Sequence, residues 1–290
     1  MPVVRCRVKI ICLLALASLL SACSAVKMGY SQAPTLAYFY LDGYADFTDA
    51  QSLAVKADLN RLLVWHRQTQ LSVYADLLDK LQPLVLANIT PGQACTVFQD
   101  VRRKLLPLAS QAEPAVAALA MSLQPEQLQH MQRKFSRGNT DYRQNFMDAA
   151  PSVLRAKRYE QAVSRADMLY GTLDQPQLKR IGQLVDQSIF NAGLVYAERL
   201  RRQQDALQTL RTLSTSSVAA ARADVRALLE RTLDSPDAAY REYAEKIVQE
   251  GCRSVAELHN ITTPAQRKKA SNVLRGYVQD FRALASQSDG

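Results

Sequence analysis

The sequence is poor in the residue patterns that most catalytic sites require. It has only three histidines, His66, His130 and His259, and none of them stands in H-E-x-x-H spacing. No C-x-x-C pair occurs, and the glycine signatures G-x-S-x-G and G-x-G-x-x-G and the P-loop are missing. A catalytic site needs a nucleophile or base together with an orienting partner. We therefore expect a protein that is not an enzyme and that holds no metal and no cofactor.

An apolar run long enough to span a bilayer is missing as well. A transmembrane helix needs about 20 apolar residues, whereas the run at residues 10–20 has eleven. Three basic residues precede it, an order that is typical of an export signal. The run ends at Leu20-Ser21-Ala22-Cys23, which resembles the bacterial lipobox, where the cysteine becomes the first mature residue and carries lipid. We expect residues 1–22 to be a lipoprotein signal peptide and Cys23 to be lipidated; an ordinary signal peptide with a chance cysteine is the alternative.

The charge balance is basic, and its meaning depends on the compartment. The chain has 36 basic and 27 acidic residues, a net charge of +9, which falls to +6 when the three basic residues of the signal peptide are removed. In a cytosolic protein this excess would suggest a nucleic-acid partner, but an exported lipoprotein rarely meets nucleic acid. We expect attachment to the membrane through the N-terminal lipid and no nucleic-acid partner. Ser24 follows the cysteine in place of aspartate, which by resemblance to sorted lipoproteins indicates the periplasmic face of the outer membrane.

Two of the five cysteines remain for the folded domain. Cys6 and Cys12 lie in the predicted signal peptide, and Cys23 takes the lipid. Cys95 and Cys252 are left as an isolated pair in an oxidising compartment. We predict a disulfide between them, which would close a loop of about 157 residues and add about 4–5 kcal/mol on the chain-entropy model. Two separate buried thiols are the alternative, because spacing alone does not establish pairing.

Period-two alternation is absent and β-branched runs are scarce, whereas apolar residues recur at helical spacing. Four narrow apolar stripes lie within residues 59–81, 178–192, 218–232 and 273–284. Narrow stripes need partner surfaces, so these helices must pack on one another. We predict an all-α, elongated and bent bundle of about six to eight helices within residues 47–290. One helix near 60 Å is predicted over residues 48–86, and Pro107 and Pro114 are expected to break or kink another.

The three histidines have structural interpretations. His66 lies on the first apolar stripe, which favours a satisfied seam histidine over a metal ligand. His259 lies near a predicted helix C-terminus, where the helix dipole would favour its charged form. His130 stands among glutamine and lysine, which predicts exposure to water.

The predicted helix starts repeat one pattern. It stands at residues 88–93 and 260–266 and, more loosely, at residues 123–127 and 173–177. Thr90 and Thr263 can each cap a helix whose first turn contains proline, and Gln93 and Gln266 follow three residues after the cap. This is a capping box with proline at the first helical position. The intervals between the starts are unequal, so the pattern does not indicate a solenoid.

A basic stretch supplies the candidate binding face, which consists of Tyr142, Arg155, Arg158 and Arg165. Arg158 and Arg165 are seven residues apart and share a helix face, so the group would present a groove to an acidic partner or headgroup. The alternative is a solvated face whose arginines pair with Glu160 and Asp167.

Aromatic residues gather directly after the predicted lipid site. They are Tyr30, Tyr38, Phe39, Tyr40, Tyr44 and Phe47. We expect residues 23–46 to form a lipid-anchored tether and aromatic segment, and ten tether residues reach at most about 33–36 Å. The cluster therefore stays near the bilayer, where it would contact the interface or dock a partner. The alternative is that the segment folds back to cover the end of the bundle.

Two stretches resemble an uncharacterised family of proteobacterial lipoproteins. Residues 29–51, GYSQAPTLAYFYLDGYADFTDAQ, look like the N-terminal signature of that family. A second match, similar to the family's R…R…G-x-L-x-x-x-Q segment, comprises Lys157, Arg158, Arg165, Gly171, Leu173 and Gln177. Family members often carry glutamate where this chain has Asp167. The resemblance implies a helical envelope lipoprotein and no known activity.

These observations predict an outer-membrane-anchored periplasmic lipoprotein that acts by non-enzymatic binding or as a structural protein, with an envelope protein as candidate partner. Residues 123–127, L-Q-P-E-Q, more faintly resemble the L-T-x-x-Q motif of periplasmic helical stress proteins and ATP-independent chaperones, from which they depart at the threonine. That resemblance implies the alternative of a chaperone or stress sensor that binds unfolded chains along a concave helical face. An envelope hydrolase is a third alternative.

Overall fold

The computed structural model describes residues 25–287. Within this range the chain forms twelve α-helices and one five-residue π-helical segment, and it forms no strand. The predicted all-α class is confirmed, whereas the predicted number of six to eight helices is too low. None of the helices in the described range combines the length and the apolar character needed to cross a membrane. The predicted signal peptide and the predicted lipidation site, Cys23, lie outside the described residues.

The elements in chain order are α2 (Ala25–Ser31), α3 (Ala33–Ala45), α4 (Asp49–Thr69), α5 (Leu71–Leu84), α6 (Pro91–Ser122), α7 (Pro125–Tyr142), η1 (Arg143–Met147), α8 (Pro151–Tyr170), α9 (Gln175–Asp186), α10 (Ala192–Leu213), α11 (Val218–Leu233), α12 (Ala238–Asn260) and α13 (Pro264–Ala285). The prediction of a single long helix over residues 48–86 is wrong, because Gln70 lies between α4 and α5 as the last cap residue of one and the first cap residue of the other. Thr69 Oγ1 donates to the Trp65 carbonyl at 2.7 Å, and such a bond competes with the backbone ladder and bends helices. The segment expected as a tether contributes two further helices, α2 and α3.

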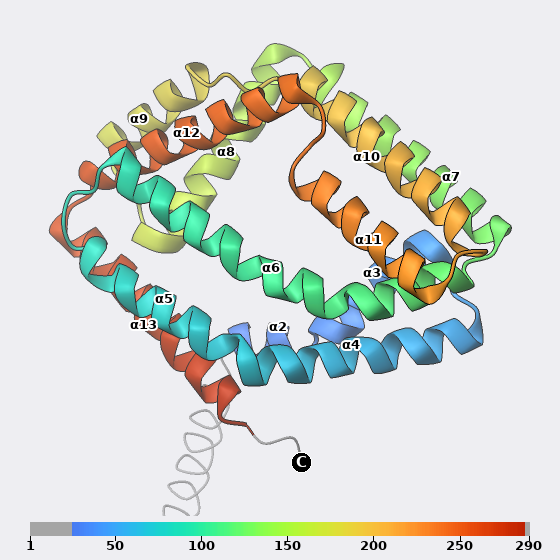
Figure 1. Ribbon diagram of the computed structural model, residues 1–290. Coiled ribbons are helices and arrows are strands. Elements are labelled where there is room, and N and C mark those ends of the chain that lie inside the picture. The colour runs from blue at the N-terminus through green and yellow to red at the C-terminus, as the bar shows by residue number, and fades with distance from the viewer. Residues whose placement is uncertain (1–24, 288–290) are drawn as a thin grey trace, which may run out of the picture.

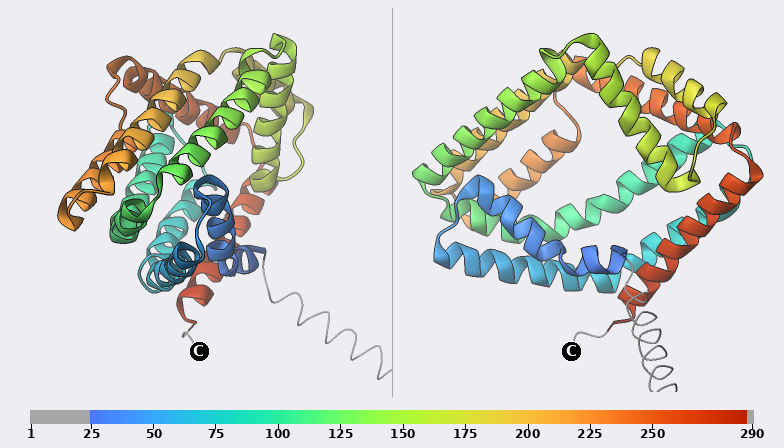
Figure 2. Two further views of the ribbon diagram at one scale, coloured as in Figure 1. Left: turned by 90° about the vertical axis from the view of Figure 1, so that its right-hand side faces the viewer. Right: turned by 180° about the vertical axis from the view of Figure 1, so that it is seen from behind.

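The helices lie along the sides of a ring (Figure 1), which Figure 2 shows edge-on and from behind. One side is α4, the next is the pair α5 and α13, the third contains α9 and α12, and the fourth is the pair α7 and α10. The helices α6 and α11 lie inside this outline. The bent bundle that the sequence predicts thus closes on itself. Lys27 of α2 pairs with Asp280 of α13 at 3.5 Å, and Arg282 of α13 pairs with Asp79 of α5.

Two prolines lie inside α6 without ending it. The sequence predicts that Pro107 and Pro114 break or kink a helix; the helix runs from Pro91 to Ser122, so they do not break it. Both prolines are exposed. The backbone carbonyls that lose their helical partner at these positions can therefore bond to water.

The apolar core contains two small clusters. One joins α6 to α10 and α11 and contains Ala117, Ala120, Leu213, Ala221 and Val225. The other joins α8 to α9 and α13 and contains Ala166, Tyr170, Ile181, Val185 and Ala270. Alanine is frequent in both clusters, so the helices approach closely along narrow seams, because interaxial distance follows the side chains at the contact.

A carboxylate reinforces the seam between α6 and α11. Glu113 accepts hydrogen bonds from Arg222 Nε at 2.9 Å and from Arg226 Nε at 2.8 Å. The hydrogen bonds from Arg226 and then from Arg222 lower the pKa of Glu113 to about 2. Glu113 is therefore ionised throughout the physiological pH range, and its charge is matched by two guanidinium groups.

Five helices begin with a glutamine capping box. In each box the third helical residue is a glutamine whose Oε1 accepts a hydrogen bond from the backbone N–H of the residue that precedes the helix. The five glutamines are Gln51, Gln93, Gln127, Gln177 and Gln266. Each box satisfies one of the N–H groups that a helix N-terminus leaves unbonded.

Four of these glutamines form two reciprocal amide pairs, which we call glutamine clamps. In the first clamp Gln51 Nε2 donates to Gln127 Oε1 at 3.2 Å, and Gln127 Nε2 donates to Gln51 Oε1 at 2.8 Å. Each Nε2 also donates to the backbone carbonyl five residues before the partner glutamine. Gln51 bonds to Ser122 O and Gln127 bonds to Asp46 O, both at 2.9 Å. The first clamp joins the start of α4 to the start of α7.

The second clamp repeats this geometry between α9 and α13. Gln177 Nε2 donates to Gln266 Oε1 at 2.7 Å, and Gln266 Nε2 donates to Gln177 Oε1 at 2.9 Å. The carbonyls five residues before the partner again accept, Ile261 O from Gln177 at 3.2 Å and Thr172 O from Gln266 at 3.0 Å. Both clamps lie in largely buried surroundings, where an unpaired amide would be costly. They therefore fix which helix starts meet.

Gln93 has the same capping box but no clamp partner. Its Oε1 accepts from the Thr90 N–H at 2.8 Å. Within residues 25–287 no group bonds to Gln93 Nε2, and the side chain is exposed.

Replacing Gln177 with alanine should lower the free energy of unfolding by about 2–3 kcal/mol, because it removes the capping bond and leaves buried partners of the second clamp unpaired. Replacing Gln93 with alanine is the matched control, and it should cost only about 0.5–1 kcal/mol because that amide has no clamp partner. Urea unfolding followed by circular dichroism measures both values. Equal losses for the two variants would contradict a stabilising role of the clamp.

Candidate functional site

An apolar groove of about 630 Å³ opens between α5, α6 and α12, and residues of α8 and α13 complete its lining. Its size lies within the range that is typical of small-molecule sites. The apolar residues of its walls include Leu81, Leu84, Val97, Phe98, Ile247 and Val255. Phe98 and Val255 are 45% and 53% exposed, so the groove is open to solvent along this edge. None of the described residues that line it is charged.

Two helical stripes that sequence analysis did not identify form the walls. On α6 the residues Ala94, Val97 and Phe98 follow i, i+3, i+4 spacing and share one face. On α12 the lining residues run from position 247 to position 259 at helical spacing. The α12 stripe could have been found in the sequence by counting apolar residues, but only the structure shows that it faces α6.

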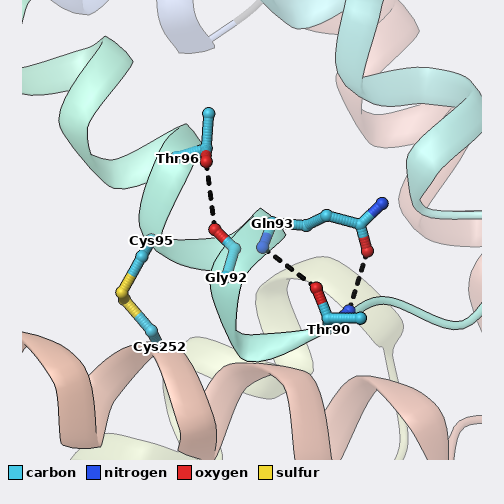
Figure 3. The surroundings of a disulfide bond; sticks show 6 residues. All are labelled: Thr90, Gly92, Gln93, Cys95, Thr96 and Cys252. Carbon is cyan, nitrogen blue, oxygen red and sulfur yellow. Dashed lines mark hydrogen bonds between the residues drawn. A yellow bond between two sulfur atoms is a disulfide. The ribbon is translucent and has the colours of Figure 1, made fainter.

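A disulfide between Cys95 and Cys252 joins the two walls (Figure 3). The Cα atoms of the two residues are 5.2 Å apart. The structure therefore contains the disulfide that the cysteine count predicts. Cys95 follows Gln93 by two residues, so the bond holds the first turns of α6 against α12 and keeps the groove walls at a fixed separation.

A buried tyrosine–histidine pair lies at the inner end of the groove. His259 Nε2 is 2.8 Å from the Ala87 carbonyl, and His259 Nδ1 is 2.9 Å from Tyr170 Oη. A carbonyl only accepts, so Nε2 carries the proton and Nδ1 accepts from the Tyr170 hydroxyl. Burial lowers the pKa of His259 and raises the pKa of Tyr170 to about 12. The expectation of a charged His259 is therefore wrong, because desolvation outweighs the helix dipole.

The rim of the groove is tied to the end of α12. Asn260 bonds to Ile89 in both directions: Asn260 Oδ1 accepts from the Ile89 N–H and Asn260 Nδ2 donates to the Ile89 carbonyl, each at 2.9 Å. Arg267 Nη2 donates to Asn88 Oδ1 at 2.6 Å. The side chain of Gln93 also lines the groove. Its free Nε2 is therefore a hydrogen-bond donor at the rim that no described group occupies.

The other two histidines lie outside the groove. His66 Nδ1 is 2.9 Å from Tyr30 Oη, and burial lowers the pKa of His66. His130 Nε2 lies 3.3 Å from the Gly43 carbonyl in a partly buried position, so His130 is less exposed to water than the sequence predicts. No group of three or more His, Cys, Asp or Glu side chains within residues 25–287 is placed to hold a metal ion.

The four residues of the candidate binding face do not share one cavity. Tyr142 ends α7, donates to the Ala192 carbonyl at 3.2 Å and stacks on Tyr196. Arg158 lies over the Phe190 ring, 4.8 Å from its centroid. Tyr142 thus contacts the first turns of α10, and Arg158 contacts the short segment that precedes α10.

The other two arginines of that face, Arg155 and Arg165, lie in different surroundings. Arg155 bonds to both carboxylate oxygens of Asp186 on α9, and Arg165 is exposed. Within residues 25–287 neither forms a salt bridge with Glu160 or Asp167, the partners that the solvated alternative predicts. A binding role for this face stays a prediction.

A family model matches residues 43–241, and the chain belongs to that family, a family of unknown function (DUF6279). No curated protein and no solved structure matches the chain. The match includes Cys95 and Tyr170 but ends before Cys252 and His259. One partner of the disulfide and one partner of the buried pair therefore lie beyond the matched residues.

His259 should make the stability depend on pH between pH 7.5 and pH 5.5. Its pKa in the folded protein lies below the unfolded value of about 6.5, so the unfolded chain binds the proton first and the free energy of unfolding falls as the pH drops through that value. The change His259→Gln removes this group and should make the fall smaller. The pKa of His66 is also lowered in the folded protein, but His66 is present in both proteins, so the difference between them reports on His259. Urea unfolding of both proteins at the two pH values measures the difference, and equal falls would contradict the assignment.

Proposed function

We propose that this protein is a lipid-anchored, non-enzymatic binding protein on the periplasmic face of the outer membrane, and that its groove holds an acyl chain. The ordered basic residues, apolar run and lipobox of residues 1–23 support the anchor on Cys23. Ser24 supports the outer membrane. The disulfide between Cys95 and Cys252 supports an oxidising compartment.

The groove has few free hydrogen-bonding groups, and this scarcity favours an acyl chain over a peptide as the ligand. Both ring nitrogens of His259 and the hydroxyl of Tyr170 are already bonded, which leaves Gln93 Nε2 as the free donor among the described lining residues. An extended peptide would bring unpaired N–H and C=O groups into this lining, at about 1–3 kcal/mol each. An acyl chain has no such groups along its length, and each buried methylene contributes about 0.8 kcal/mol.

Gln93 gives the bound chain a direction. Its Oε1 is held by the Thr90 N–H, so the amide is oriented and only Nε2 remains to donate. An ester or carboxylate oxygen at the end of an acyl chain is an acceptor of the required kind. The polar end of the ligand therefore lies at the start of α6, and the hydrocarbon lies between Val97 and Val255.

The same geometry supports binding over catalysis. A general base needs a free lone pair within reach of its substrate, and both nitrogens of His259 are bonded to the protein. No Asp or Glu is among the described residues that line the groove. The hydrolase alternative is therefore the weakest of the three.

A chaperone that binds unfolded chains is the second candidate function. Phe98, Val101 and Leu105 follow helical spacing along α6 and are 45%, 44% and 54% exposed. This row extends from the groove over the helix surface, and exposed apolar rows of this kind mark interaction sites. Suppression of the aggregation of a denatured client at low stoichiometry, unaffected by blocking the groove, would favour this function over acyl binding.

Filling the groove should weaken acyl-chain binding. A chain secreted without lipid, starting at Ser24, is titrated with a fluorescent long-chain fatty acid. The change Val97→Trp should weaken binding at least about tenfold because the larger side chain occupies the groove. The change Gln93→Ala should weaken it about five- to tenfold through the lost hydrogen bond at the rim.

The matched control is Val153→Trp on α8, a residue that is 57% exposed and does not line the groove. Its affinity should equal that of the wild type. Absence of saturable binding, or unchanged affinity in the Val97→Trp variant, would contradict the proposed function.

A further inference from the structure

The helix α3 carries apolar residues around most of its circumference, and one side packs on the protein, with Tyr44 beside Tyr40 at a ring-centroid distance of 5.2 Å at the boundary. Tyr38 Oη donates to Ser52 Oγ of α4 at 3.0 Å. The Tyr44 ring contacts the Phe135 ring of α7 at a centroid distance of 5.6 Å, and Ala45 is buried. On this side the aromatic segment folds back on the helices, as one of its two sequence interpretations states.

The other side of α3 faces outward and is also apolar. Leu36, Phe39 and Tyr40 are 62%, 64% and 67% exposed. At 3.6 residues per turn these three side chains fall within an arc of about 100°. No charged residue occurs between Lys27 and Asp42. A surface helix ordinarily turns a charged or polar face to water, so a helix that is apolar on both sides needs a cover on its outer side.

The position of the predicted lipid anchor on Cys23 indicates what lies against the outward side of α3. Cys23 precedes Ala25, the first residue of α2, by two residues, and two residues span at most about 7 Å. One residue separates α2 from α3, and Met28 of α2 is 61% exposed. In Figure 2, α2 and α3 lie together on one face of the ring, next to α4. A lipid on Cys23 would therefore hold the start of α2 close to the bilayer, and α3 follows α2 after one residue.

We propose that the outward face of α3, formed by Leu36, Phe39 and Tyr40, rests in the interfacial layer of the membrane that carries the anchor. The inference depends on the lipidation of Cys23 in the proposed function. Tyrosine suits this layer because its ring is apolar and its hydroxyl can reach water, and leucine and phenylalanine are side chains that interfacial helices bury. Apolar side chains that enter the interface add to the anchoring of a lipid chain and also fix the orientation of the domain.

Depth-dependent quenching tests the contact. The processed lipoprotein is purified and reconstituted into phosphatidylethanolamine–phosphatidylglycerol vesicles with or without brominated acyl chains. Its single tryptophan is removed by Trp65→Phe, and one reporter is added, either Phe39→Trp or the control Val153→Trp. In Figure 1, α8 begins at the edge of the ring opposite α2. Brominated lipid should weaken the emission of the Phe39→Trp reporter at least about twofold and leave the control unchanged.

The intact mass of the same sample separates the two possible failures. A mass equal to that of the bare polypeptide overturns the lipid anchor of the proposed function and this inference with it. A lipidated mass with no quenching of the Phe39→Trp reporter overturns the membrane contact alone. An emission that is insensitive to brominated lipid but shifts to the blue with protein concentration would show that a second copy covers this face, which also overturns the contact.

Discussion

Reciprocal pairing of glutamine amides at helix starts is the constraint on which the ring depends. A helix N-terminus leaves backbone N–H groups unbonded, and the capping box satisfies one of them with the glutamine Oε1. That fixes the amide so that its Nε2 can donate only outward, to a second helix start with the same arrangement. If one helix start were displaced relative to the other, both buried amides would lose their partners, and an unpaired buried amide is costly. Gln51 with Gln127 and Gln177 with Gln266 therefore determine which distant segments meet.

The groove follows from the second clamp. Ile261 supplies a carbonyl to Gln177, and the two residues before it, His259 and Asn260, reach Ala87 and Ile89 in the connection between α5 and α6. The disulfide then fixes the first turns of α6 against α12 from the other side. The start of α6 is thus held by His259, Asn260 and the disulfide. Its capping-box glutamine, Gln93, is bonded at Oε1, and its Nε2 has no partner among the described residues. The same local motif joins helix starts in two pairs and leaves a hydrogen-bond donor without a clamp partner at the fifth start.

The family match and the site overlap only in part. Residues 43–241 contain both members of the first clamp but only Gln177 of the second. Most of α12 and all of α13 lie beyond the match, and α12 supplies one wall of the groove. The matched range therefore contains the first clamp, whereas the groove, the disulfide and the closing of the ring involve residues outside it. The outward face of α3 likewise lies before the match.

The sequence alone determined the all-helical class and the capping boxes at Thr90 and Thr263, because these depend on spacing along the chain. It predicted the pair of Cys95 and Cys252 by elimination, but two separate thiols stayed open until the structure placed their Cα atoms 5.2 Å apart. The sequence overestimated helix length at residues 48–86, where the chain turns at Gln70 between α4 and α5 although the apolar stripe continues. It did not predict that Gln51 pairs with Gln127, that His259 is buried and neutral, or that the two sides of α3 have different surroundings. These features arise from contacts between residues 14 to 172 positions apart. Only the tertiary structure decides them, because burial and hydrogen-bond partners are properties of the packed helices and not of any local stretch.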